Sequence, residues 1–515
     1  MFENKKYLLI IFSIIILIGA SCSSKKIEPT YIPDDVSGVF CIDLKNVSNK
    51  ATDFSNAIKV MSGDKYSFVN QVFNAGVDYS KKAYFFIRTS PELSQSYTAG
   101  YIPLNNKKKF EEALKKSTKE NNINTEIKTK EDWKYIITEN QVILMWNEKQ
   151  VFFLLQGDKS DEEKLLANAQ KIIKTPENQS LEGKQNSFKE LLAQNFDASY
   201  WLNTEFTTPK LPYLSNWGNL ESILSLPKMV ESNYGLITFE KGEIITKNIV
   251  KFKEESFKKY KNIIKTSYDQ NLAKSIPLTE PIFITAFALN MKEVEKMLDE
   301  WKFLEKLKIQ VSFIDMKIED FFTMISGDIV ISGQTYGAKE MQDNDFVVAL
   351  GLEKKEIFDK FINEVASLGL AKKKKNYFVL NYDDYRVFLI EKGNTLYLTL
   401  SADLRDKILN ENNKINQKLS TSIGEQSLLF ALDYNKLNKF IPWDSIKNSD
   451  NTKNMYQNIM KELDTFEMQA APWGNATQIT NFKLKLTNKS RNAVNVLAEI
   501  IDKINKDAKE RKPNM

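Results

Sequence analysis

The strongest constraint on the fold is an internal repeat, in which five blocks recur in the same order at offsets of roughly 230 to 248 residues. The first pair of blocks, FCIDLKNV (Phe40–Val47) and FALNMKEV (Phe287–Val294), predicts a strand that turns into a helix. The second pair, Gly100–Leu114 and Val348–Ile362, predicts a strand followed by a helix with one apolar face. Because the order of the blocks is kept along the chain, the sequence predicts two tandem homologous units.

The other three pairs add a hairpin and two further strands to each unit. Val142–Leu155 and Arg386–Leu400 each contain two apolar runs around a short polar turn, and Ser160–Glu163 (SDEE) then has the spacing of a capping box. The later pairs are YWLN (Tyr200–Asn203) with FALD (Phe430–Asp433), and Glu243–Lys253 with Thr477–Thr487. Strands joined by hairpins, with single helices between them, indicate the α+β class, with mostly antiparallel sheets and packed helices.

The repeat also sets the expected boundaries. We expect a first α+β unit over residues 31–272 and a second over residues 273–505, with the junction near Ser267–Pro277. A unit of about 235 residues is long enough to bury its own core. Each unit is expected to close on a polar helix, and residues 506–515 (KDAKERKPNM) are expected to be a disordered tail.

The first 21 residues have the layout of a secretion signal. Lys5 and Lys6 form a positive head, Leu8–Ile18 is an apolar run, and small residues stand just before Cys22. The apolar run is too short to cross roughly 30 Å of hydrocarbon as a helix. We therefore expect residues 1–21 to be a signal peptide that is removed after export.

Cys22 and the two serines after it resemble the cleavage box of bacterial lipoproteins, in which the chain is cut before the cysteine and the cysteine is acylated. Gly19 departs from that box, which usually has an aliphatic residue three positions before the cysteine. In this interpretation Cys22 is lipidated, and residues 22–30 form a tether whose last eight residues reach only about 26 Å. The folded body then lies close to the membrane. The alternatives are an exported protein with a free thiol and a disulfide between Cys22 and Cys41.

The composition excludes several kinds of catalytic site. The chain has no histidine and only two cysteines, which excludes Ser-His-Asp and Cys-His systems, histidine-ligated zinc and four-cysteine metal sites. Its 72 basic and 67 acidic residues nearly balance, and no concentration of Arg and Lys marks a nucleic-acid-binding face. We expect no cofactor and no nucleic acid. The densest basic run, AKKKKN (Ala371–Asn376), is interpreted as a solvated loop between a helix and a strand, with a contact to anionic lipid as the alternative.

The repeat gives an internal test of single residues. Cys41 stands where the second unit has Ala288, which favours a small buried position over a reactive thiol. The same comparison argues against a disulfide, because the second unit does without one. Asp43 is matched by Asn290, and both residue types cap helices by accepting backbone N–H bonds. We therefore expect Asp43 to cap a helix rather than to act as a catalytic carboxylate.

The remaining acidic segments do not have the pattern of a metal site. Asp328 aligns with Lys82, and the reversed charge indicates a surface turn before a strand rather than a shared site. NYDDYR (Asn381–Arg386) falls in a predicted hairpin turn. NSDNTKN (Asn448–Asn454) lacks the spacing and the glycine of a calcium loop. No metal ligands are therefore expected.

Two tryptophans are the candidate ligand-binding residues. Trp217 and Trp443 fall in comparable places, just after the YWLN and FALD strands. They are interpreted as packing between sheet and helix, or as an aromatic groove shared by the two units for a sugar or an apolar ligand.

Three segments resemble a known family. A lipoprotein signal followed by YIPDDVSGVFCIDLKNV (from Tyr31), YIPLNNKKKFEEAL (from Tyr101) and NSFKELLAQNFDASYWLN (from Asn186) is similar to an uncharacterised family of Bacteroidetes lipoproteins, domain of unknown function 4836. The resemblance covers most of the chain after the signal. It implies a location in the cell envelope and a duplicated α+β body, and it implies no site residues.

Together these observations give one leading hypothesis and two alternatives. We expect a lipid-anchored protein of the cell envelope, held in the outer membrane by acyl chains such as palmitate, that binds or scaffolds an envelope protein or an apolar ligand without catalysis. The first alternative is an envelope hydrolase that uses a carboxylate pair, for example on glycans. The second is a purely structural spacer.

Overall fold

The computed structural model describes residues 31–51, 75–90, 92, 95–120, 126–138, 142–156, 161–203, 229–278, 281–300, 303–305, 316–334, 345–382, 385–410, 419, 422–441 and 450–510. Helices and antiparallel strands alternate along both halves of the chain, so the predicted α+β class is confirmed. None of the described helices is long and apolar enough to cross a membrane.

Among the described residues, the first half carries ten strands. Its elements are β1 (Gly38–Asp43), α2 (Leu44–Lys50), β2 (Lys82–Arg88), β3 (Tyr97–Pro103), α5 (Lys107–Glu120), β4 (Lys128–Lys130), β5 (Trp133–Ile137), β6 (Val142–Trp146), β7 (Gln150–Gln156), α6 (Glu162–Ile173), the 3-10 turn η3 (Glu177–Gln179), α7 (Leu181–Lys184), α8 (Asn186–Leu192), β8 (Ala198–Leu202), β9 (Val230–Glu240), β10 (Glu243–Phe252) and α11 (Glu254–Tyr260).

The second half carries the other ten. Its elements are α12 (Gln270–Lys274), β11 (Phe283–Ala288), α13 (Met291–Glu300), α15 (Ile318–Met324), β12 (Ile325–Gly333), β13 (Phe346–Leu352), α16 (Lys355–Ser367), β14 (Ala371–Lys373), β15 (Phe378–Tyr382), β16 (Tyr385–Lys392), β17 (Thr395–Thr399), α17 (Ala402–Asn410), β18 (Leu428–Asp433), α19 (Tyr434–Phe440), α20 (Asp450–Glu462), β19 (Leu463–Ala470), β20 (Thr477–Leu486) and α21 (Ala493–Glu510).

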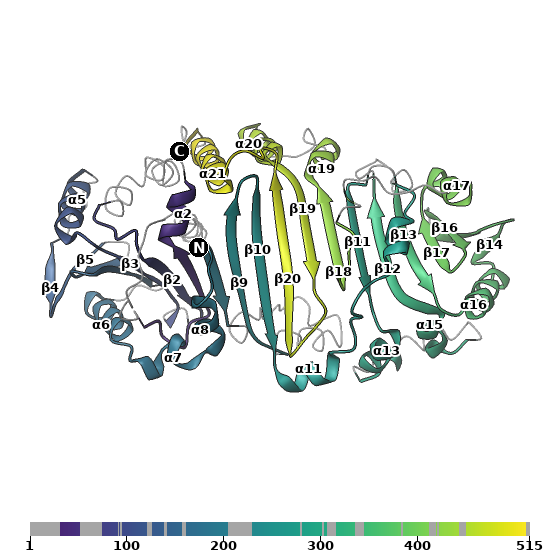
Figure 1. Cartoon of the computed structure of the whole chain (residues 1–515), viewed down its shortest axis with the longest axis horizontal. Helices are drawn as coiled ribbons and strands as arrows, with labels where there is room; N and C mark the ends of the chain where they lie inside the picture. The colour runs from purple at the N-terminus through teal and green to yellow at the C-terminus, as the bar shows by residue number, and fades with distance from the viewer. Residues whose placement is uncertain are drawn as a thin grey trace.

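All twenty strands belong to one antiparallel sheet that runs the length of the molecule (Figure 1). Its spatial order is β4-β5-β6-β7-β3-β2-β1-β8-β9-β10 and then β20-β19-β18-β11-β12-β13-β17-β16-β15-β14. Each pairing among β1–β10 has a counterpart among β11–β20. The pairing of β10 with β20 joins the halves and covers what would otherwise be an open edge on each.

The helices follow the same relation between the two halves. In Figure 1, α5 lies above the left part of the sheet and α16 below the right part, while α6 lies below on the left and α17 above on the right. A half-turn about an axis through the β10–β20 contact therefore brings one half approximately onto the other. This axis passes near the directly paired residues Lys247 and Asn481.

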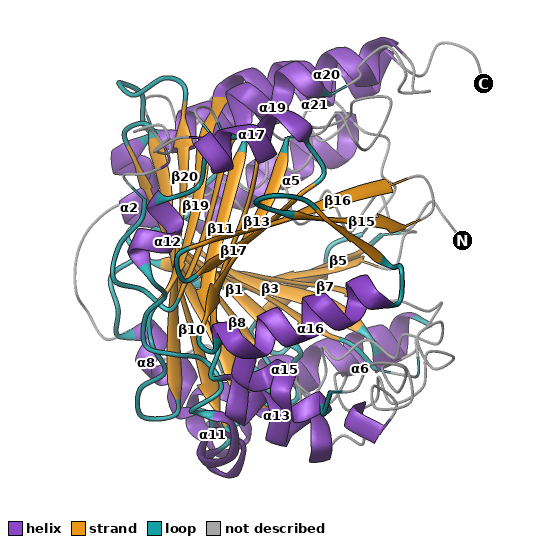
Figure 2. Ribbon diagram, turned by 90° about the vertical axis from the view of Figure 1, so that its right-hand side faces the viewer, coloured by secondary structure: helices purple, strands orange, loops and turns teal. Residues whose placement is uncertain are grey.

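Helices cover both sides of the sheet towards its ends, and the sheet curves between an upper and a lower group of them (Figure 2). We call the side that carries Trp201, Lys247 and Ala286 the front face. Apolar residues of this face form one core with α6, α7 and α8 in the first half and another with α12 and α17 in the second. On the back face, α2, α5 and α21 cover the first half, and α15 and α16 cover the second.

The last helix of the second half packs on the first half. Val494 and Val496 of α21 are buried in the back core of the first half. At the start of the second half, Tyr268, Leu272 and Ile276, in and beside α12, lie in that half's own front core. The position of α21 ties the two halves together beyond the β10–β20 contact.

Several local predictions hold, and others shift by a few residues. Phe358, Ile362 and Val365 form the buried face of α16, as their spacing predicts. The predicted capping box is displaced, because the N-cap of α6 is Asp161, whose carboxylate accepts from the backbone N–H of Lys164 at 2.8 Å. Helix α21 continues to Glu510, five residues into the predicted tail.

Candidate binding surface

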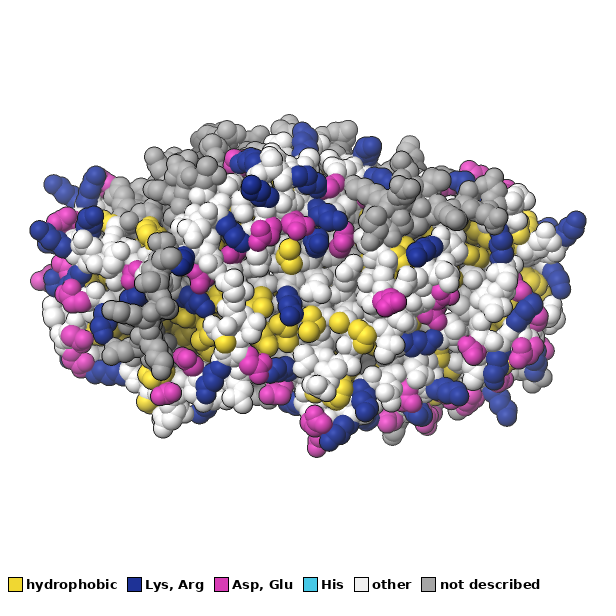
Figure 3. Space-filling model, in the orientation of Figure 1, with side chains coloured by type: hydrophobic (Ala, Val, Ile, Leu, Met, Phe, Trp, Pro, Cys, Tyr) yellow, Lys and Arg dark blue, Asp and Glu magenta, His cyan; other side chains and the backbone are white. Residues whose placement is uncertain are grey.

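The front face of the four central strands is a broad surface that is exposed at Lys247 and Asn481 and becomes buried towards Tyr234 and Ile249, which are 6% and 8% exposed. It consists of alternate residues of β9, β10, β20 and β19, because successive side chains of a strand point to opposite faces. Figure 3 looks onto this surface and shows apolar side chains across its middle, around a basic side chain, with charged side chains above them. The surface lies where the two halves meet.

The middle row of the surface crosses all four strands. Leu236 faces Lys247, Lys247 faces Asn481, and Asn481 faces Gln469. Lys247 and Asn481 are exposed, and Lys247 has no ion-pair partner among the described residues. A single uncompensated ammonium therefore stands at the centre of the surface.

Above this row the surface is charged. Lys485 lies 2.6 Å from Glu467, and Lys483 lies 3.9 Å from Glu243. Each pair joins diagonal neighbours on adjacent strands, because Lys485 lies directly opposite Thr465 and Glu243, and Lys483 lies directly opposite Glu467. Long side chains reach across such a diagonal, so the opposite charges compensate each other. The charged end thus presents polar groups that are already paired.

Below the row the surface is apolar. Ile249 pairs across strands with Tyr234 on one side and with Ile479 on the other. Tyr234 donates its hydroxyl hydrogen to Glu190 of α8 at 3.2 Å, and burial together with this carboxylate raises the pKa of Tyr234 to about 12. The apolar end is continuous with the front core of the first half.

The half-turn that relates the two halves exchanges these two ends. It brings Leu236 onto Gln469, Tyr234 onto Glu467 and Ile249 onto Lys483. These three positions are apolar or aromatic in the first half and polar or charged in the second, whereas Ile245 is brought onto another isoleucine, Ile479. The backbone is repeated at this surface, but its chemistry is repeated only in part.

The back face of the same strands is aromatic. Phe430, Phe466 and Phe482 lie side by side on β18, β19 and β20, with ring centroids 6.0 and 6.2 Å apart. In the first half, the ring of Tyr200 lies over Gly235, and its hydroxyl donates to Asn248 at 2.7 Å. Burial raises the pKa of Tyr200.

Comparison with protein families gives one match. Residues 31–494 match the family described as domain of unknown function DUF4836. The chain belongs to this family. The match spans the whole sheet and both surfaces described above, so they are features of a DUF4836 body.

Other comparisons add little to this assignment. No curated protein matches the chain. Among solved structures, crystal forms I and III of TP0453 align with TM-scores of 0.27 and 0.28 at 6% and 7% sequence identity, covering 44% of this chain and 81% of theirs. A TM-score in this range does not establish a shared fold.

The sequence-predicted site residues are only partly described. Cys22, Trp217 and Trp443 lie outside the described residues, so the lipid site and the aromatic groove stay predictions. Cys41 is buried beneath the front face, and burial raises the pKa of its thiol to about 12. Ala288 is buried as well, so the interpretation of this position as small and buried is confirmed.

The two predictions for acidic residues have opposite outcomes. Asp43 caps α2 as expected and accepts from the backbone N–H groups of Lys45 and Asn46 at 3.1 and 3.0 Å. The prediction that Asp328 lies in a surface turn is wrong, because Asp328 lies within β12 opposite Ala288. Next to the irregular position Gly327, it accepts from Ser326 and from Lys265, which explains a carboxylate in a strand.

Metal-binding clusters were not predicted, and the described residues contain no group of three or more acidic or cysteine side chains that could hold a metal ion. Asp383 and Asp384 lie outside the described residues. The basic run is not entirely a loop, because Ala371–Lys373 form the edge strand β14.

The central surface itself was missed by the sequence-based reasoning. Its signal was present in part, since the alternation in FKLKL (Phe482–Leu486) predicts one wet face on that strand. Periodicity within one strand does not show that two such strands pair with each other, and so it could not place Lys247 next to Asn481.

Proposed function

We propose that this DUF4836 protein is a lipid-anchored binding protein of the cell envelope and that the central front face holds a protein partner. The observation that carries the proposal is the exposed middle row around Lys247, between an apolar end and a charged end. Specific protein interfaces combine apolar and polar areas, and this surface offers an apolar end and a charged end side by side.

A protein partner fits this surface better than a small ligand. Small-molecule sites are concave and surround most of their ligand. The central face instead spreads over four strands of eight to eleven residues each. A partner that covers it would place a carboxylate against Lys247 and apolar side chains against Leu236 and Ile479.

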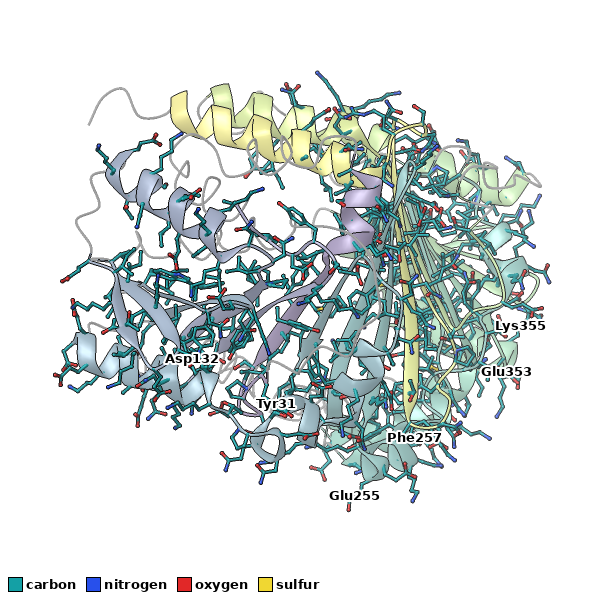
Figure 4. The ribbon with its side chains drawn as sticks, turned by 60° about the vertical axis from the view of Figure 1, so that its left-hand side comes forward. Tyr31, Asp132, Glu255, Phe257, Glu353 and Lys355 are labelled. Atoms are coloured by element: carbon teal, nitrogen blue, oxygen red, sulfur yellow. The ribbon has the colours of Figure 1, made fainter. Side chains whose placement is uncertain are left out.

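The proposed anchor is the acylated Cys22. The described body begins at Tyr31, which lies near the lower edge of the molecule in Figure 4 and donates to Glu177 at 3.3 Å. Because few residues separate Cys22 from Tyr31, an acylated chain would hold the body close to the lipid surface, here proposed as the outer membrane. Several acyl chains give stable attachment, whereas a single chain gives marginal attachment.

The proposed origin of the body is a duplication, with a first unit over residues 31–272 and a second over residues 273–505. The internal sequence repeat and the one-to-one match of strand pairings support it. In this view the binding surface formed where two copies of one edge strand met, and the first copy then gained apolar residues that the second lacks.

The partner is tested by photo-crosslinking in cells, with a photoreactive side chain at Asn481 and, as a control site, at Lys439 on α19. Adducts are identified by mass spectrometry. We expect a protein adduct at Asn481 that Leu236→Gln reduces roughly five- to thirtyfold, the range for an apolar interface residue worth about 1 to 2 kcal/mol. The control variant Gln179→Leu, at an exposed residue of η3 outside the central surface, should leave the yield unchanged.

Two outcomes would overturn the partner proposal. One is an Asn481 yield no higher than that at Lys439. The other is equal loss in Leu236→Gln and Gln179→Leu, which would show that the loss does not depend on the central surface.

The anchor is tested by metabolic labelling with a radioactive fatty acid. The wild type should incorporate label, and Cys22→Ala should incorporate none. If label incorporation survives in Cys22→Ala, the anchor assignment is wrong, whatever the crosslinking shows.

A further inference from the structure

The far end of the sheet in the second half carries an unusual hairpin. We propose that this hairpin, residues 368–376 and here called the basic tip, binds the surface of an anionic lipid bilayer directly. This contact is separate from the acyl anchor proposed at Cys22. The tip lies at the β14 end of the sheet, opposite the β4 end (Figure 1).

The first observation is apolar exposure at the tip. Leu368 and Leu370 are 47% and 48% exposed, which places them among the few large apolar side chains exposed to this degree in the described structure. Gly369 stands between them with a φ of +77°, and the N–H of Leu370 donates to the carbonyl of Val365 at 3.1 Å. This bond pattern is a fixed helix ending. The backbone therefore holds the two leucines outward.

The second observation is the charge that follows. Lys372, Lys373, Lys374 and Lys375 are all exposed, and the tip contains no acidic residue. The N–H of Lys374 donates to the carbonyl of Tyr377 at 2.8 Å, which closes the turn between β14 and β15. Two leucines and four lysines are thus presented on one tight hairpin.

The groove beside the tip adds to the same chemistry. It has a volume of about 430 Å³, and Lys373, Lys374 and Lys375 form part of its wall. Its two carboxylates, Asp359 and Glu391, share one partner, Lys355, at 3.1 and 2.6 Å. Lysines therefore outnumber carboxylates around the groove, and a phosphate group of a lipid would meet ammonium groups from Lys373, Lys374 and Lys375 there.

The corresponding hairpin of the first half lacks these features. Residues 126–132 contain two lysines and three acidic residues, including Asp132 at the turn (Figure 4). Lys128 is paired with Glu162 at 2.9 Å, and Glu131 with Lys174 at 2.6 Å. Both β4 and β14 are edge strands, and charge on an edge guards against pairing with other chains. Either hairpin could protect its edge strand in this way. Such protection does not require exposed leucines, and it does not require that all the charges be positive.

A bilayer surface is the partner that matches both parts of the tip. Lysines near an anionic membrane strengthen binding by about fivefold each, and apolar side chains enter the boundary between head groups and acyl chains. A soluble phosphate or a nucleic acid would engage the lysines but leave Leu368 and Leu370 exposed to water.

The test uses the chain from residue 22 onward with Cys22→Ala, so that no acyl chain is attached. It is sedimented with vesicles of phosphatidylcholine alone, or of equal parts phosphatidylcholine and phosphatidylglycerol. We expect binding to the anionic vesicles only. The pair Lys374→Gln and Lys375→Gln should weaken it about 25-fold. The pair Leu368→Ser and Leu370→Ser should weaken it as well.

The matched control is the pair Lys128→Gln and Lys130→Gln on β4, which removes the same charge from the counterpart hairpin and should leave binding unchanged. Equal loss in this control would overturn the proposal in favour of general attraction by net charge. Equal binding to both kinds of vesicle, or binding to neither, would also overturn it. So would full binding by the leucine variant together with displacement by inorganic phosphate, which would identify a phosphate site instead.

Discussion

Helices α5 and α16 pack on the back face of the two halves in the same way, but the side chains that hold them to the sheet differ. On α5, Phe110 packs against Trp146 of β6, with ring centroids 5.6 Å apart. Trp146 stands two residues before the turn of its hairpin, and the residue at the same place in the second half is Glu391. Glu391 instead forms an ion pair with Lys355 of α16.

The comparison separates what the backbone requires from what each half adds. Phe110 and Phe358 are both fully buried, so an aromatic ring under the helix is common to both halves. The other contact between helix and hairpin differs: it is made by the indole of Trp146 in the first half and by the ion pair of Glu391 with Lys355 in the second. The same holds at the central surface, where Tyr234 and Ile249 are replaced by Glu467 and Lys483. The strand pairing that the two halves share determines the fold. Residues that differ between the halves are therefore the better candidates for function.

The largest effect that would sharpen this comparison is expected from Trp146→Ala. The side chain is completely buried, and its indole N–H donates to Glu111 at 3.0 Å. Removing it leaves a large cavity and should lower the free energy of unfolding by about 3 to 5 kcal/mol. Urea denaturation followed by circular dichroism measures the change.

Lys355→Ala is the matched variant in the second half. Lys355 is half exposed, and an exposed ion pair is worth less than about 1 kcal/mol. If both variants cost the same, the two contacts are equivalent and the comparison fails.

The elements within each half could be predicted from the sequence. Strand Thr477–Leu486 follows from its alternation, and α16 follows from the spacing of Phe358 and Ile362. The α+β class rests on such local patterns. Helix ends were less certain, because Ser160 and Asp161 are both good N-caps and only the structure shows which residue caps α6.

What could not be predicted depends on contacts between distant segments. The pairing of β10 with β20 joins residues more than two hundred positions apart. Taken alone, the sequence of each strand predicts only an edge strand with one exposed face. The packing of α21 onto the first half is equally non-local. The exposure of Leu368 and Leu370 was missed because a leucine at a helix end is usually buried, and a pattern of residue types does not report burial.

A smaller effect is expected from Gly235→Ala. A Cβ at this position would lie 2.3 Å from the ring of Tyr200, so the ring would have to move and break its hydrogen bond to Asn248. Overpacking of this kind costs about 1 to 3 kcal/mol. The second half has Met468 at this position, beside Phe430, and so has no glycine to accommodate a tyrosine.

The double variant Gly235→Ala with Tyr200→Ala tests this account. Because the clash needs both side chains, the cost of Gly235→Ala should largely disappear in a Tyr200→Ala background. Strict additivity of the two costs in urea denaturation would contradict it.

The smallest effect concerns pH and again compares the two helix contacts. Burial alone would raise the pKa of Glu111, but the hydrogen bond from Trp146 and the ammonium of Lys134 outweigh it and hold the pKa below its ordinary value of 4.5. A carboxyl group whose pKa is lowered by folding stabilises the folded state at every pH above its pKa in the unfolded chain.

That stabilisation is lost as the pH falls through the lower pKa of the folded state. Glu111→Gln should therefore be less stable than the wild type at neutral pH by about 1 kcal/mol, and this gap should close in acid. The matched control is Asp359→Asn. Asp359 directly follows Phe358 in α16, just as Glu111 directly follows Phe110 in α5. The Asp359 carboxylate pairs with Lys355 in an exposed position, where an ion pair is worth less than about 1 kcal/mol, so this variant should differ little from the wild type at neutral pH. A gap that stays constant for Glu111→Gln, or that closes equally for Asp359→Asn, would show that the indole contact does not distinguish the two halves.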